Sequence, residues 1–210
     1  MKILLVAATT FEIAPLLAQQ NKLPFELLIT GVGQLHTAFH LGATLQQNKY
    51  DLVLNAGIAG SYRRDWELGK VVNVVSEQYG DLGIEFSDGT FKDMFEMGFI
   101  EKDAFPYENG RLFNKNAANY SFLDNANGLT INKVHGFEPS IDATKNYYDC
   151  DIETMEGVGF FYACLMHRVP FLAIRSISNY VEKRNREAWN IGLAIRNLNE
   201  TLEIIMTTLQ

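Results

Sequence analysis

Short apolar runs rich in Val, Ile and Leu recur along the chain and alternate with helical patterns. Such runs are typical of strands that are covered on both faces, as in parallel sheets. The expected strands are Ile3–Ala8, Phe25–Thr30, Leu52–Asn55, Val71–Ser76, Leu129–Val134 and Phe171–Ile177. The expected helices between them are Glu12–Gln19, Leu35–Gln47 and Glu156–His167. This order predicts a single domain, residues 1–210, with an α/β fold: a three-layer α/β/α sandwich around a mostly parallel mixed sheet.

The end of the chain carries the clearest helical period. Its apolar residues are spaced by four and three positions: Ile191, Ile195, Leu198, Leu202, Ile205 and Leu209. This spacing predicts an amphipathic helix. Asn185 is expected to be its N-cap, because asparagine is favoured at that position.

Charge and composition exclude several classes of function. The net charge of −7 argues against a nucleic-acid partner, since binding to phosphates requires a basic surface. No apolar run reaches the roughly 18 residues of a membrane span, and the N-terminus lacks a secretion cleavage site. Cys150 and Cys164 follow no metal-binding or redox spacing. We therefore expect a cytoplasmic protein with reduced thiols and no membrane partner.

Neither a cofactor nor a metal is expected. Gly31-Val32-Gly33 follows a predicted strand, but the third glycine of a dinucleotide-binding motif is missing. His36 and His40 share a helix face without the adjacent carboxylate of a zinc site. The stretch Asn55–Ser61 holds Gly57 and Gly60 around Ala59. It is interpreted either as a turn that brings backbone amides close to a ligand or as a tight structural turn.

Four polar side chains stand near the ends of predicted strands. Glu12 follows the first strand, Glu156 begins a helix, and Arg175 and Asn179 lie at the end of the last strand. Open α/β sheets bind ligands at the carboxyl ends of their strands. Taken alone, Glu12 would be interpreted as an acid stabilised by a helix dipole, and Arg175 as half of a structural ion pair.

Three blocks of the chain resemble the nucleoside phosphorylase and nucleosidase superfamily in order and spacing. They are the first strand up to Glu12, the stretch Asn55–Gly60, and Met155-Glu156 followed by Arg175–Asn179. Within that superfamily the chain is similar to purine nucleosidases that act on methylthioadenosine and adenosylhomocysteine. The tail from Arg175 to Trp189 more closely resembles the futalosine hydrolase family, which releases hypoxanthine from futalosine. The likeness is weakest between about residues 86 and 129.

The resemblance implies a role for each block. A carboxylate at the position of Glu12 is the general base for water. Glu156 binds the ribose hydroxyls, and Met155 contacts the sugar. Arg175 balances the two carboxylates. Gly57, Ala59 and Gly60 form the backbone of the substrate site. The implied ligand is a small purine nucleoside, and the implied assembly is a homodimer or a higher homo-oligomer.

Asn179 is the main departure from the adenine-specific nucleosidases, which carry an aspartate there. A carboxamide cannot supply an acidic proton, but it presents one donor and one acceptor together. Its NH₂ group can bind O6 of a 6-oxopurine while its carbonyl accepts the N7 proton. An ionised aspartate would face O6 with lone pairs on both sides. Asn179 therefore favours hypoxanthine over adenine as the released base.

The nucleophile is predicted to be water. The phosphorylases of this superfamily bring arginines to phosphate, but the corresponding stretches here, residues 9–12 and 52–55, carry no cation. A phosphate dianion would meet Glu12 unscreened. Release of adenine and a nucleoside-binding module without catalysis remain as alternatives.

Two aromatic features of the sequence have more than one interpretation. Seven aromatic residues between Phe86 and Phe113 are expected to form a lid, a subunit interface or a wall of the 5′ subsite, or to pack into their own core. Phe137 is a candidate for stacking on the purine, with a plain core role as the alternative. The cation for the carboxylate of futalosine is expected among Lys183, Arg184 and Arg186.

Overall fold

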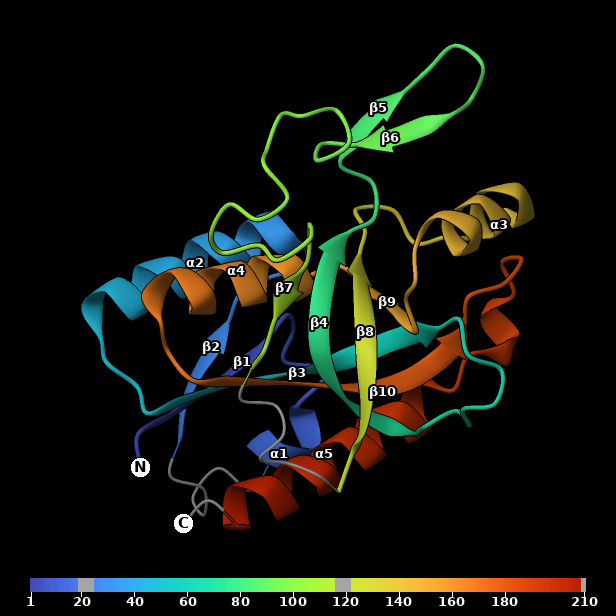
Figure 1. The fold of residues 1–210 in the computed structure, drawn as a ribbon. Helices are drawn as coiled ribbons and strands as arrows, with labels where there is room; N and C mark the ends of the chain where they lie inside the picture. Colours follow the sequence, from blue (N-terminus) through green and yellow to red (C-terminus); the bar gives the residue numbers. More distant parts are fainter. Residues whose placement is uncertain (19–24, 116–121, 209–210) are drawn as a thin grey trace.

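The protein forms an eight-stranded sheet between two layers of helices (Figure 1). The computed structural model describes residues 1–18, 25–115 and 122–208. The strands are β1 Ile3–Ala7, β2 Phe25–Ile29, β3 Leu52–Ser61, β4 Val71–Tyr79, β5 Gly83–Glu85, β6 Phe91–Asp93, β7 Leu112–Phe113, β8 Asp124–Thr130, β9 Ile152–Thr154 and β10 Phe171–Tyr180. The helices are α1 Ala14–Leu17, α2 Gln34–Gln47, α3 Glu138–Tyr147, α4 Gly157–His167, the 3₁₀ helix η3 Arg186–Ala188 and α5 Ile191–Thr208.

The sheet is mixed, and part of it closes on itself. Its order is β10-β4-β8-β9-β3-β1-β2, and β10 also pairs with β3, so that β3, β10, β4, β8 and β9 form a ring. The pairs β1–β2, β1–β3, β3–β10, β4–β8 and β8–β9 are parallel, whereas β4–β10, β3–β9 and β4–β7 are antiparallel. The predicted sandwich with a mostly parallel mixed sheet is confirmed. The ring of strands was not predicted.

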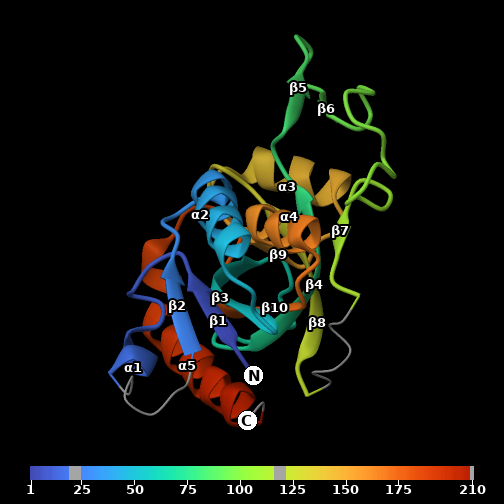
Figure 2. The ribbon, with the colours of Figure 1, turned by 90° about the vertical axis from the view of Figure 1, so that its left-hand side faces the viewer.

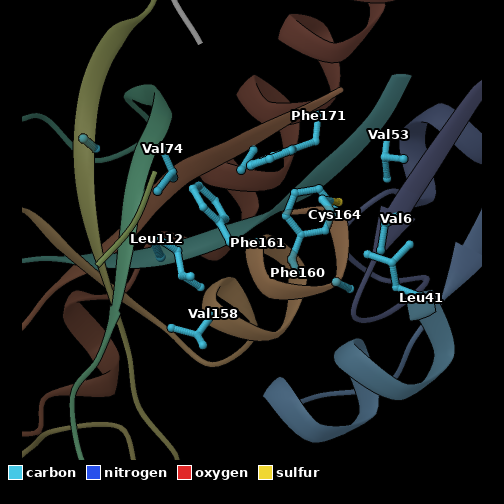
Figure 3. Close-up of a cluster of buried hydrophobic side chains, with 14 of the residues drawn as sticks. Val6, Leu41, Val53, Val74, Leu112, Val158, Phe160, Phe161, Cys164 and Phe171 are labelled. Atoms are coloured by element: carbon cyan, nitrogen blue, oxygen red, sulfur yellow. The ribbon is translucent and has the colours of Figure 1, made fainter. Parts of the chain in front are cut away.

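Two hydrophobic cores cover the two faces of the sheet (Figure 2). Alternate residues of β1 point to opposite sides, so Val6 joins one core and Leu5 the other. The first core lies between the sheet and α2 and α4, where Phe160, Phe161 and Phe171 pack edge to face (Figure 3). The second core lies under α5, which buries the periodic face that the sequence predicts.

Several strand limits differ from those predicted. The stretch Asn55–Ser61 is not a turn: β3 continues through both glycines to Ser61. The strand expected at Leu129–Val134 lies earlier, at Asp124–Thr130, because its polar first half pairs in parallel with β4. The short β9 was not expected, since three residues give too little pattern to recognise. The strands therefore include polar residues and glycines that lie outside the apolar runs of the sequence.

The helix ends also need two corrections. The helix expected at Glu12–Gln19 is shorter in the structure, where α1 begins at Ala14 and Glu12 lies in the turn before it. Gln19 and Leu209, the last residues of two expected helical patterns, lie outside the described residues. Asn185 precedes η3 and does not cap the last helix. Asn190 takes that role, because its Oδ1 accepts the Leu193 N–H at 3.2 Å.

The aromatic segment extends away from the body of the molecule as the hairpin β5–β6 and an irregular loop (Figure 1). Its buried members, Phe95 and Tyr107, stack edge to face at 5.1 Å, and Tyr107 also lies 6.2 Å from Tyr162 of α4. Both residues belong to the first hydrophobic core, so the base of the segment packs onto the body of the molecule. Its role as a lid, an interface or a wall of the 5′ subsite stays a prediction. Phe99 and Phe105 remain exposed.

Candidate active site

A cavity lies where the carboxyl ends of several strands meet. It has a volume of about 340 Å³. Its walls come from the segments that follow β1, β2 and β8 and from the last residues of β3, β9 and β10. Six of the predicted site residues line it: Glu12, Ala59, Gly60, Met155, Glu156 and Asn179. Segments far apart in the sequence thus supply the two predicted carboxylates and the predicted carboxamide to a single cavity, and Glu153 adds a third carboxylate.

Glu12 is held by three hydrogen bonds in the turn after β1. Its Oε2 accepts the main-chain N–H and the hydroxyl of Thr9, both at 3.0 Å. Its Oε1 accepts the Ile58 N–H at 3.3 Å. Donors to both oxygens fix the carboxylate at the cavity wall while leaving lone pairs for a ligand. A carboxylate fixed in this way is suited to orient a water molecule and accept its proton.

Glu156 faces the same cavity from the residue before α4. Its Oε1 accepts the N–H of Gly33 at 2.8 Å. Burial raises the pKa of Glu156 above the usual carboxyl range, and the charge of Glu12 adds to the rise; the Gly33 N–H and Arg175 act in the opposite direction. The two acids are therefore close enough to interact electrostatically through a partly apolar site.

Arg175 lies behind the cavity wall. Its side chain is fully buried, with Nη1 donating to Ile174 O at 2.9 Å and Nη2 donating to Asn55 Oδ1 at 2.5 Å. It approaches Glu12 across Gly57, which explains why that position has no side chain. Arg175 and Gly57 lie behind Glu12 and do not line the cavity.

Asn179 is held by its own neighbours in β10. Its Oδ1 accepts the Ser178 hydroxyl at 2.8 Å, and its Nδ2 donates to Tyr180 O at 3.0 Å. One N–H and one lone pair of the carboxamide remain available to a ligand. The assignment of oxygen and nitrogen follows from these two partners. Asn179 can therefore present a donor and an acceptor side by side.

Phe137, like Arg175 and Gly57, is a predicted site residue that does not line the cavity, and of the three it is the exposed one. It precedes α3 and its side chain is 69% exposed. Ile131 and Val134, from the segment after β8, line the cavity instead. Trp189 adds an aromatic wall that the sequence analysis did not single out. Stacking of Phe137 on a purine stays a prediction.

Other residues contribute to the site although the sequence pattern around them indicated something else or was too short to interpret. Gly31-Val32-Gly33, considered above only as an incomplete cofactor motif, supplies the N–H that binds Glu156. Gly33 has a φ of 100°, a conformation that favours glycine. Glu153 of β9 lines the cavity but lies in a strand too short to predict. Glu77 of β4 is fully buried beneath the start of α4.

The described part of the chain holds no group of three or more His, Cys, Asp and Glu residues arranged for a metal ion. None of the described helices has the length and apolar character needed to cross a bilayer.

Comparison with known proteins finds similarity to futalosine hydrolases. A futalosine hydrolase from Streptomyces coelicolor is 30% identical over 190 residues, which is 87% of this chain and 79% of that protein. The futalosine hydrolase of Helicobacter pylori superposes with a TM-score of 0.78 at 16% identity, over 100% of this chain and 98% of that one. No protein-family model matches the chain.

A second kind of solved structure shares the fold. The 5′-methylthioadenosine/S-adenosylhomocysteine nucleosidase of Colwellia psychrerythraea, in complex with adenine, superposes with a TM-score of 0.79 at 18% identity. The match covers 99% of this chain and 95% of that one. Identities this low establish the shared fold, whereas the sequence relative from Streptomyces coelicolor establishes the family.

Proposed function

This chain belongs to the futalosine hydrolase family, and on that premise we propose that it hydrolyses the N-glycosidic bond of futalosine. The products are hypoxanthine and dehypoxanthine futalosine, and the reaction serves menaquinone biosynthesis. The observation that carries the proposal is the meeting of Glu12, Glu156 and Asn179 in one cavity of about 340 Å³. That volume is within the usual range for a small-molecule site, roughly 300–1,000 Å³.

The reaction breaks the bond between C1′ of the ribose and N9 of the purine. Water forms the new bond to C1′ and gives a proton to Glu12, whose carboxylate is fixed by Thr9 and Ile58. The sugar becomes cationic as the bond breaks. Glu156 binds the ribose hydroxyls and stabilises that positive charge electrostatically. A well-placed general base contributes about 10²–10⁴-fold to the rate.

The departing base keeps the electron pair of the broken bond and takes up a proton from solvent at N7, which balances the proton that water gives to Glu12. Asn179 can accept that N7–H through Oδ1 and donate to O6 through the free N–H of Nδ2. Adenine offers an amino group where hypoxanthine offers O6, so the same carboxamide orientation does not match it. This difference supports the 6-oxopurine as the leaving base.

The 5′ end of the substrate carries a carboxylate that needs a cation. Arg184 lies 5.3 Å from the ring of Trp189, which lines the cavity. Of the three cations considered, Arg184 is thus the one supported by an aromatic neighbour at the cavity wall. The proposal also includes a cytoplasmic location and a homo-oligomeric state, for which the reduced cysteines and the family likeness are the support.

The decisive experiment is to incubate the protein with futalosine and with methylthioadenosine in the absence of phosphate and to separate the free bases. Hypoxanthine from futalosine supports the proposal. Adenine as the dominant product would instead support the adenine-releasing nucleosidase. Saturable binding without turnover would indicate a non-catalytic module, and strict dependence on phosphate would indicate a phosphorylase.

A further inference from the structure

Glu153 stands beside Asn179 on the same face of the sheet. In the strand register, Asn179 of β10 pairs with Gly60 of β3, and Gly60 pairs with Glu153 of β9. A Cβ at Gly60 would lie 3.2 Å from Asn179 Nδ2 and 3.4 Å from Glu153 Cγ. Because Gly60 has no side chain, the carboxamide and the carboxylate border one open space. All three residues line the cavity.

The carboxyl group of Glu153 accepts three hydrogen bonds. Its Oε2 accepts the Tyr62 hydroxyl and His135 Nδ1, both at 2.7 Å, and its Oε1 accepts the main-chain N–H of His135 at 3.2 Å. Burial and the charge of Glu153 raise the pKa of Tyr62, so the phenol keeps its proton and remains a donor. Both oxygens of Glu153 thus act as acceptors, and a lone pair of Oε1 remains free for a ligand.

His135 holds the carboxylate of Glu153 in place. Its Nδ1 donates to Glu153 Oε2 at 2.7 Å. Its Nε2 lies 3.3 Å from the hydroxyl of Thr144 on α3. His135 therefore fixes the position of a carboxylate whose residue is only 4% exposed.

The edge of hypoxanthine presents N7, O6 and N1–H in that order. Asn179 can bind N7–H and O6. The N1–H group, which comes next along the edge, requires an acceptor. Adenine differs at this position because its N1 carries a lone pair and no hydrogen. A carboxylate next to Asn179 therefore matches the 6-oxopurine and repels the 6-aminopurine.

We infer that Glu153 is a specificity-determining residue that accepts N1–H of the 6-oxopurine base, held in place by Tyr62 and His135. The inference rests on the proposed function and adds a second contact that selects the base. Placing adenine N1 against the carboxylate leaves both without a hydrogen bond. We expect this mismatch to disfavour the 6-amino nucleoside by about ten- to a hundredfold in kcat/KM.

The main test compares Glu153→Gln with the wild-type enzyme on futalosine and on its 6-amino counterpart. A glutamine amide can donate to N1 of adenine, so the ratio of the two kcat/KM values should fall by about ten- to a hundredfold. Tyr62→Phe is the matched control, because it removes one donor to Glu153 and keeps the acceptor. It should leave the ratio within about threefold of wild type, since the acceptor is unchanged. A purely structural Glu153 would lower both rates together and leave the ratio unchanged, which would overturn the inference.

A second experiment uses the wild-type enzyme alone. Hypoxanthine, 1-methylhypoxanthine and adenine are compared as product inhibitors of the wild-type enzyme acting on futalosine. Blocking N1 with a methyl group should weaken inhibition at least about tenfold, and adenine should also inhibit poorly. Equal inhibition by all three bases would overturn the inference even if Glu153→Gln failed to fold. Lack of futalosine turnover by the wild-type enzyme would instead refute the proposed function.

Discussion

Glu12 and Arg175 both approach the space that a side chain at Gly57 would occupy. A Cβ at Gly57 would stand 3.0 Å from Glu12 Oε1 and 3.5 Å from Arg175 Nε. The contact with Glu12 would be tighter than an ordinary van der Waals contact, so the acid would have to shift. Gly57 therefore controls where the proposed general base stands, although it does not itself line the cavity.

We expect Gly57→Ala to lower kcat by at least about tenfold, because displacements of less than 1 Å weaken a positioned base. Steady-state kinetics on futalosine measures the effect. Gly42→Ala is the control: Gly42 lies within α2, and the position of its Cβ is open. That variant should keep full activity, since alanine is favoured over glycine in a helix. Equal activity of the two variants would show that Gly57 does not position Glu12.

Replacing Glu12 by Gln should reduce turnover at least a hundredfold, because the amide cannot accept the proton of the attacking water. The size of the side chain is preserved, so we expect substrate binding to persist. Single-turnover kinetics and equilibrium binding of futalosine separate the two effects. Thr9→Ala removes one hydrogen bond to Oε2 and should give a smaller loss. An unchanged rate in Glu12→Gln would remove Glu12 from the mechanism.

The sequence predicts those parts of the molecule that depend on local pattern. The apolar runs place β1, β2 and the first half of β3, and the four-and-three spacing places α5. Glu12 and Glu156 stand beside recognisable elements, but the roles expected for them come from the family resemblance and not from the local pattern. The layer order then follows from general rules of α/β packing.

Long-range pairing could not be predicted in the same way. The ring of strands depends on β10 pairing with both β3 and β4, and no local pattern encodes such contacts. Glu153 illustrates the consequence for the site. Its position beside Asn179 follows only from the register of β9 with Gly60, and β9 has three residues.

Replacing Asn179 by Asp should shift the preference from hypoxanthine toward adenine. A carboxylate oxygen in place of Nδ2 would face Tyr180 O, which now accepts a hydrogen bond at 3.0 Å. The same oxygen would accept the 6-amino group of adenine and repel O6 of hypoxanthine. We expect the ratio of kcat/KM for the 6-oxo and 6-amino nucleosides to fall by about ten- to a hundredfold.

Competition between the two nucleosides, followed by separation of the released bases, measures this ratio directly. Asn185→Asp provides the control, because it makes the same chemical change at an exposed residue that does not line the cavity. It should leave the ratio unchanged. If Asn179→Asp also left it unchanged, Asn179 would have no part in selecting the base.

Glu77 is a buried acid beneath the helix that carries Glu156. Its Oε2 accepts the Thr130 hydroxyl at 2.9 Å, and a Cβ at Gly128 or Gly157 would overlap its carboxyl group. Burial raises the pKa of Glu77 to about 7; Arg175 and Thr130 lower it, and the charge of Glu156 raises it further. The two glycines therefore make room for an acid that is close to half-ionised at neutral pH.

The raised pKa predicts how stability depends on pH. Between about pH 4.5, where an unperturbed glutamate titrates, and about pH 7, folded Glu77 binds a proton more strongly than unfolded Glu77 does. The contribution of Glu77 to the free energy of unfolding should therefore fall as pH rises through this window, by on the order of 3 kcal/mol, and stay constant above it. Glu77→Gln should remove this slope, whereas Glu101→Gln, at an exposed loop position, should keep it. Urea unfolding of the three proteins from pH 4.5 to 8 measures the difference, and parallel curves would show that Glu77 titrates like an exposed acid.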